Sequence, residues 1–163
     1  MKFIGRKKMV DVLNGVEITR QGSCVVKIAY ADNTKVTLEL ARKITTELIR
    51  RYGKERLGLV HVAGRETTVE EGVREFLAGK SGAQNKIAEA FVVKNLNQRI
   101  LGNFYLRVGR PACPTEVFTL EDEAVKWVKM YCPRQMDGQV IKNSEQNTGD
   151  GVHSSPVQNF GAN

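Results

Sequence analysis

Long apolar runs are absent from this sequence of 163 residues. The longest, such as residues 57–63 and 91–93, are far too short to cross a bilayer as a helix, which excludes a membrane span. An apolar segment is also missing after the basic residues 2–8, because Asp11 and Asn14 follow at once. We therefore expect no signal peptide.

Cysteine is scarce as well. The three cysteines, Cys24, Cys113 and Cys132, are widely spaced and form no C-x-x-C pair. This pattern excludes a zinc ribbon and a disulfide scaffold, and it fits a protein of the reducing cytoplasm. We expect Cys24 and Cys113 to act as small buried apolar side chains, and we expect a cytoplasmic location.

What the sequence does contain is typical of a globular chain. Hydrophobic residues make up 41% and charged residues 26%, which is enough to form one ordinary domain. The composition changes at Pro133, after which Gln, Asn, Ser and Gly dominate. We assign residues 1–132 to the domain and residues 133–163 to a polar, disordered tail. His153, Ser154 and Ser155 lie in this tail, where no scaffold holds a catalytic geometry.

The net charge of +7 raises the question of nucleic-acid binding. Part of the positive charge is paired locally, since Glu39 precedes Lys43 by four residues on an expected helix. The remaining basic clusters, residues 6–8 and 50–56, are not interleaved with aromatic residues as in a surface that stacks bases. A solvated basic face is the simpler interpretation, and nucleic acid is not an expected partner.

Strands and helices are expected to alternate along the domain. Thr37 precedes an apolar pattern of helical period that ends before Gly53, and Thr68 with Glu71 matches a capping box. The remaining elements follow from short β-branched or apolar runs and from caps. We expect strands at 16–20, 24–31, 57–63, 87–93 and 115–118, and helices at 37–52, 68–79, 95–106 and 120–131. This order predicts an α/β fold with a largely parallel sheet and the first two strands as an edge hairpin.

Several short segments in these elements form a pattern together. They are TLELA at 37–41, AFVV at 90–93, QRILGNF at 98–104, PTEVFT at 114–119 and EDEAVKW at 121–127. Through these segments, residues 16–131 resemble the STAS-like family of small bacterial proteins related to anti-sigma-factor antagonists, and in particular a branch common in Bacteroidetes. The resemblance implies a four- or five-stranded sheet flanked by helices, and it implies no known activity for this branch.

In the phosphorylated regulators of this family, a Ser or Thr at a helix N-terminus follows a central strand and is modified by a partner kinase. The corresponding stretch here is residues 61–68, in which Thr67 and Thr68 supply hydroxyls. The Asp-Ser-Ser-Gly-like string of those regulators is absent.

The end of the expected strand 57–63 is the first candidate binding or modification surface. It carries His61, Arg65, Glu66, Thr67 and Thr68 to the carboxyl edge of a parallel sheet, where ligands commonly bind. If Thr68 begins a helix, its free amides favour an anion or an acidic group of a partner. The simpler alternative is that Thr68 only caps the helix and that Arg65 is solvated.

His61 is the only histidine of the domain, and no second metal-ligand type lies near it in sequence. A hydrogen-bonded strand histidine is therefore favoured over a metal ligand, and we expect neither a metal nor a cofactor.

A second candidate surface lies on the expected helix 95–106. Arg99, Asn103 and Arg107 are spaced by four and so share one face, beside Gly102, which permits close approach of another backbone. A polar helix face with a packing glycine is the simpler alternative.

Three function classes remain. The first is a non-catalytic regulatory module that binds a protein partner, because no catalytic pattern fits and the family resemblance favours it. The second is a small-ligand or lipid-binding module, because related folds hold apolar ligands beneath a helix. The third and least favoured is an enzyme that uses His61 with Arg65 or Glu66. A homodimer is left open.

Removal of residues 133–163 is the first test. We expect the melting temperature of the shortened chain to stay nearly unchanged, because this segment has few apolar residues with which to contact the domain. A thermal melt of both chains measures this, and a loss of many degrees would show that the segment docks.

Overall fold

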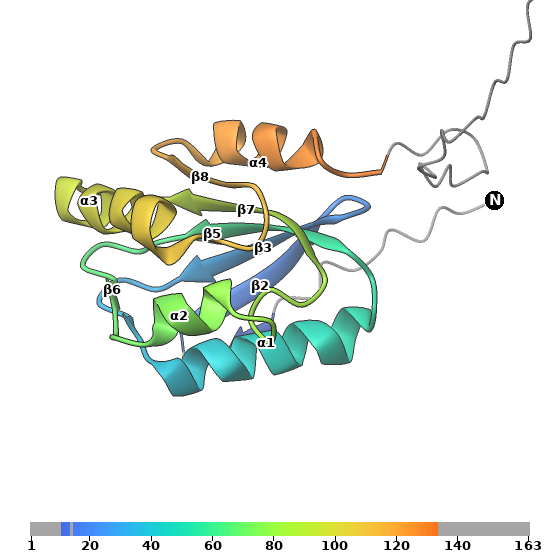
Figure 1. Ribbon diagram of the computed structural model, residues 1–163, viewed down its shortest axis with the longest axis horizontal. Coiled ribbons are helices and arrows are strands. Elements are labelled where there is room, and N and C mark those ends of the chain that lie inside the picture. The colour runs from blue at the N-terminus through green and yellow to red at the C-terminus, as the bar shows by residue number, and fades with distance from the viewer. Residues whose placement is uncertain (1–10, 14, 134–163) are drawn as a thin grey trace, which may run out of the picture. The chain divides into compact units, whose positions relative to one another are not determined.

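The computed structural model describes residues 11–13 and 15–133 (Figure 1). The basic residues 2–8 and most of the polar tail, including His153, Ser154 and Ser155, lie outside the described residues.

A six-stranded mixed sheet forms the centre of the domain. Its strands lie in the order β1-β2-β3-β5-β7-β8. The pairs β1–β2 and β2–β3 are antiparallel, whereas β3, β5, β7 and β8 run parallel to one another. The bounds are β1 Asp11–Leu13, β2 Val16–Gln21, β3 Val25–Tyr30, β5 Leu57–Val62, β7 Lys86–Val92 and β8 Thr115–Phe118.

Helices connect the parallel strands, as expected for parallel pairing. They are α1 Leu38–Tyr52, α2 Val73–Ala78 and α3 Leu96–Phe104, and a π-helical turn η1, Tyr105–Gly109, continues α3. A further helix, α4 Glu121–Lys129, follows β8. The Thr37 hydroxyl accepts the Leu40 N–H at 3.1 Å, and the Asn95 side chain accepts the Gln98 N–H at 2.9 Å, so both predicted caps are confirmed. Within the described part of the chain, no helix has the length and apolar character needed to span a membrane.

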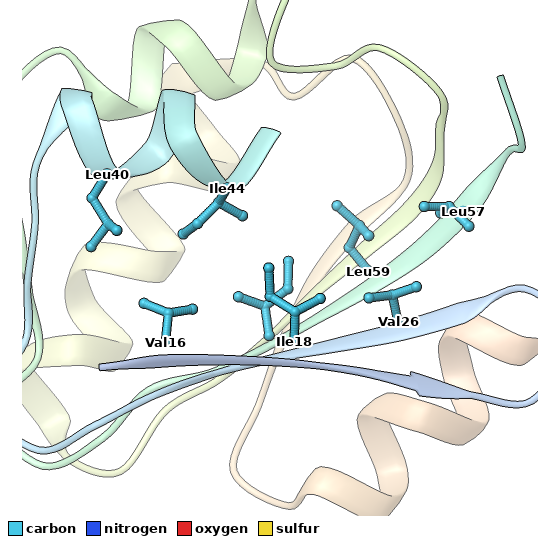
Figure 2. Close-up of a cluster of buried hydrophobic side chains, with 8 residues drawn as sticks. Val16, Ile18, Val26, Leu40, Ile44, Leu57 and Leu59 are labelled. Atoms are coloured by element: carbon cyan, nitrogen blue, oxygen red, sulfur yellow. The ribbon is translucent and has the colours of Figure 1, made fainter. Parts of the chain in front are cut away.

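Two apolar clusters hold the helices on opposite faces of the sheet. On one face, Leu40 and Ile44 of α1 pack onto strand residues, as Figure 2 shows. On the other face, Ala124 and Val128 of α4 pack onto β5 and β7. The helix α3 lies on the α1 side, where Gly102 is in contact with Val117 of β8. The predicted α/β class, the hairpin β2–β3 and the parallel strands are confirmed.

The predicted sheet was too small, and the hairpin is not at the edge. The strand β1 pairs outside β2, so that the sheet has six strands where four or five were expected. The short run 11–13 ends two residues before Gly15, and only the completed antiparallel pairing identifies it as a strand.

The predicted helix start at Thr68 is wrong. Thr68–Val69 is instead strand β6, which pairs in parallel with β4, Lys35–Val36. The Thr68 N–H donates to the Thr34 carbonyl at 3.0 Å, so it needs no helical cap. The Glu70 carboxylate accepts the Leu38 N–H at 3.0 Å and so caps α1. The helix α2 begins only after Gly72, whose φ of 86° requires glycine or strain.

The expectation of separate cysteines is also wrong. Cys24 and Cys132 form a disulfide, with a Cα–Cα distance of 6.0 Å across a sequence separation of 108. Cys24 precedes β3 and Cys132 follows α4, and the packing of α4 on the sheet brings the two together. Sequence spacing carries no information about such a long-range contact. Cys113 is the free, half-buried cysteine of the described residues.

The contact of α4 with β5 supplies a second test. A Cβ added at Gly58 would clash with Cγ1 of Val128. We expect Gly58→Ala to lower the free energy of unfolding by about 1–3 kcal/mol through overpacking. Combined with Val128→Ala, the loss should fall short of the sum of the two single losses, because the smaller side chain makes room. Urea denaturation measures all three variants, and strictly additive losses would contradict the contact.

Candidate functional site

The five residues predicted to form a binding surface at the end of β5 do not lie together on one exposed surface. Arg65, Glu66 and Thr68 are exposed, whereas His61 and Thr67 are buried at 6% and 8% exposure. The burial of Thr67 argues against its modification in the folded chain. Because no helix begins at Thr68, the predicted anion site at a helix N-terminus is absent.

Arg65 is bound to Asp32 rather than to His61. Its backbone N–H donates to Oδ1 of Asp32 at 2.7 Å, and its Nε donates to Oδ2 at 2.9 Å. These two hydrogen bonds hold the pKa of Asp32 below its usual range. The pair joins the loop after β5 to the turn after β3, so the structure gives Arg65 a positioning role.

His61 belongs to a chain of buried polar side chains on three neighbouring strands. Its Nδ1 lies 2.9 Å from the Tyr30 hydroxyl of β3, and its Nε2 lies 3.0 Å from Oε1 of Glu89 on β7. The same Glu89 oxygen accepts the Lys86 ammonium at 2.7 Å. The imidazole also stacks on the Phe91 ring, with 5.0 Å between the ring centroids. The preference for a hydrogen-bonded strand histidine is confirmed.

Glu89 is the acidic member of this group of buried polar side chains. Its side chain is 1% exposed, and burial alone would raise its pKa. The Lys86 ammonium and the hydrogen bond from His61 outweigh burial and lower the pKa of Glu89 to about 2. Burial and the Glu89 charge raise the pKa of Tyr30, which keeps its proton. With Glu89 ionised, Nε2 of His61 donates to it, and Nδ1 forms the hydrogen bond with the Tyr30 hydroxyl.

A cavity of about 150 Å³ lies beside these buried polar side chains and is lined in part by Tyr30 and His61. It is at the carboxyl ends of β3, β5 and β7 and beneath α2 and α3, the position in which open parallel sheets commonly bind ligands. Its lining is mainly apolar, and Arg74 of α2 is its one formally charged side chain. A smaller cavity of about 40 Å³ beneath α1 shares Tyr30 and His61 with it.

Tyr105 of η1 also lines the cavity. Its side chain is buried and contacts the Phe91 ring edge-to-face, with 5.7 Å between the centroids. Its hydroxyl is the buried side-chain polar atom without a hydrogen-bond partner in the described part of the chain. Burial, the Glu89 charge and Cys113 raise the pKa of Tyr105.

The second predicted surface is exposed, and it is more apolar than expected. Arg99, Asn103 and Arg107 are exposed, and Gly102 makes its close approach to the Val117 side chain rather than to a backbone. The large apolar residues of α3 and η1 face outward too, with Leu96 at 70% and Val108 at 60% exposure. We call this set the α3 face: Leu96, Ile100, Leu101, Phe104 and Val108.

The sequence prediction missed Tyr30, Arg74, Lys86 and Glu89. One signal was available, since Glu89 interrupts the otherwise apolar run 87–93 in the middle of a strand expected to be buried. A charged residue at such a position must be paired or bound. Tyr30 and Arg74 gave no such signal, because only the fold brings them to the cavity. No group of three or more potential metal-ligating side chains occurs among the residues that the structure describes.

Replacement of Glu89 tests whether its buried interactions with Lys86 and His61 stabilise the fold. Its ionised form stabilises the fold fully above about pH 4.5, its ordinary pKa, and this contribution is lost as the pH falls towards 2. We expect Glu89→Gln to flatten this part of the pH dependence. At neutral pH it should lower the free energy of unfolding by about 3 kcal/mol, because Lys86 loses its buried counter-charge.

Urea denaturation between about pH 7 and pH 3 measures both effects. Glu47→Gln is the matched control, since the pKa of Glu47 is likewise lowered to about 2, by Arg50 and Arg51 of α1, while its side chain is more exposed than that of Glu89, at 19% against 1%. The control should cost less at neutral pH. Equal losses for the two variants would contradict the role of burial.

A comparison with solved structures finds a protein with a similar fold. An uncharacterised protein of the DUF3478 family with a SpoIIAA-like fold, from Shewanella loihica PV-4, superposes with a TM-score of 0.51. The match covers 74% of this chain and 98% of that chain at 13% identity, so it shows the fold alone. The predicted STAS-like fold is thereby confirmed. No curated protein matches the chain.

A protein-family model also matches the amino-acid sequence. The model described as a domain of unknown function, DUF7793, matches residues 18–132, nearly all of the described domain. The chain belongs to this DUF7793 family, and its fold is SpoIIAA-like.

Proposed function

We propose that this chain is a non-catalytic regulatory module that binds a partner protein through the α3 face. The observation that carries the proposal is the exposure of five large apolar side chains on one helix and its π-helical extension. Scattered exposed apolar residues are normal, but a contiguous set marks a surface that another molecule covers. Leu96, Ile100 and Phe104 recur every four residues and so form a continuous stripe.

The charges around the stripe favour an acidic partner. Residues 94–110 contain Lys94, Arg99, Arg107 and Arg110 and no acidic residue. All four basic side chains are exposed. An amphipathic segment that pairs apolar residues with Asp or Glu complements this surface in both respects. The predicted second surface, Arg99, Asn103 and Arg107, thus becomes the polar margin of the α3 face.

The geometry of His61 supports the absence of catalysis. Both ring nitrogens are engaged, by Tyr30 and by Glu89, and the side chain is 7% exposed. Arg65 pairs with Asp32, and Glu66 is exposed on the loop, so neither residue completes an acid–base pair with His61. A cytoplasmic location remains a prediction, and the Cys24–Cys132 disulfide would have to persist there against reducing conditions.

The test compares full-length variants in capture from cell extract followed by binding of purified components. Ile100→Ser with Phe104→Ser removes the centre of the stripe while leaving the buried side of α3 intact. Leu120→Ser is the matched control, because Leu120 is 57% exposed and lies outside the α3 face. We expect one acidic protein to bind the wild type and the control, and to bind the double variant at least tenfold more weakly.

Two results would contradict this proposal. If the double variant and the control bind the purified partner equally, the α3 face is not the docking surface. If sedimentation shows a dimer of the wild type that dissociates on Ile100→Ser with Phe104→Ser, the occupant is a second copy of this chain rather than an acidic partner.

A further inference from the structure

We infer that the cavity beneath α2 and α3 is a binding site for a small monocarboxylate whose apolar part is about the size of a six-membered ring. The inference does not depend on the proposed protein interaction, because the cavity shares only Leu101 with the α3 face: the other four residues of that face do not line the cavity.

The walls of the cavity select an apolar body. They include Val73 and Leu77 of α2, Phe91 of β7 and Leu101 of α3, with Val36, Val69 and Val93 completing the apolar lining. The volume of about 150 Å³ is sufficient for a benzene-sized molecule. It is too small for a long acyl chain, so the site favours a compact acid over a fatty acid.

Arg74 selects the carboxylate. It is the one charged side chain of the lining, and no acidic residue lines the cavity. The guanidinium lies 5.1 Å above the centre of the Phe104 ring, and it forms no ion pair with the described residues. A half-buried arginine beside an apolar cavity and without a counter-charge is the donor that a ligand carboxylate pairs with, by two parallel hydrogen bonds.

Apart from the Tyr105 hydroxyl, which has no hydrogen-bond partner among the described residues, the main polar side chains of the lining are already engaged. Gln98 donates to the carbonyls of Gly64 and Thr67 at 2.9 and 3.3 Å and accepts the Lys94 N–H at 2.8 Å. Tyr30 and His61 hydrogen-bond each other. These contacts fix the walls of the cavity and leave Arg74 as the cation for the ligand.

Phenylacetate is the probe, and phenylacetamide is its uncharged isostere. Amide chemical shifts of the full chain are followed by NMR during titration. We expect phenylacetate to bind with a Kd of about 1 mM or below, and phenylacetamide to bind about tenfold more weakly. Decanoate, which carries the same charge on a longer chain, should bind more weakly than phenylacetate.

Three variants locate the site. Arg74→Gln should remove the preference for phenylacetate over phenylacetamide, whereas Arg42→Gln should keep it. Arg42 is the matched control because its guanidinium also stacks on a ring, that of Phe76 at 6.0 Å, and it does not line the cavity. Ala63→Phe fills the cavity from β5's end and should abolish binding of both probes.

Each contrary result overturns the inference. It fails if phenylacetate does not bind at about 10 mM, if Arg74→Gln and Arg42→Gln behave alike, or if folded Ala63→Phe binds as the wild type does. Should Ala63→Phe not fold, Val69→Trp replaces it, because Val69 lines the cavity at 46% exposure and tolerates a larger side chain. Tighter binding of decanoate than of phenylacetate would identify a lipid site instead.

Discussion

A carboxylate buried in the middle of the sheet is the constraint on which this end of the domain depends. An ionised carboxylate survives in such a place only when it is paired and hydrogen-bonded. Glu89 meets this condition through Lys86 on its own strand and His61 on the next one, and His61 in turn binds Tyr30 on a third strand. The side chains therefore tie β3, β5 and β7 together at the level where the backbone ladders already pair them. A shift of register between β5 and β7 would take the His61 hydrogen bond away from the buried carboxylate.

The same constraint divides the α1 side of the sheet into two regions. Where β2, β3 and β5 present Val, Ile and Leu, α1 packs closely onto them (Figure 2). At the carboxyl ends of the strands, where Tyr30 and His61 lie, the sheet is covered by the short helix α2 and by α3. The cavity lies between these helices and the sheet. The cavity beneath α2 and α3, of about 150 Å³, is accordingly larger than the one of about 40 Å³ beneath α1.

Much of the fold could be predicted from the sequence because its signals are local. The caps at Thr37 and Asn95, the helical period of α1 and the apolar runs of β5 and β7 depend on neighbours in the chain. What could not be predicted depends on distant partners. Thr68 matched a capping box, but the strand β4 offered its backbone a stronger alternative. Cys24 meets Cys132, and His61 meets Glu89, only when the sheet is assembled. The predicted residues His61 and Thr67 line the cavity, whereas Tyr30 and Arg74, which also line it, were missed.

The helix α3 shows why a four-residue apolar spacing predicts a helix but not its orientation. Its buried side consists of Gln98, Gly102 and Tyr105: an amide that binds two carbonyls, a glycine seated on Val117, and a tyrosine against Phe91. These contacts hold the helix on the sheet without help from Leu96, Ile100 or Phe104. The large apolar side chains therefore contribute little to the packing of α3 and remain in water at an unfavourable free energy. A helix that is held by its polar and small residues while its apolar stripe stays outside has the arrangement that the proposed partner binding requires.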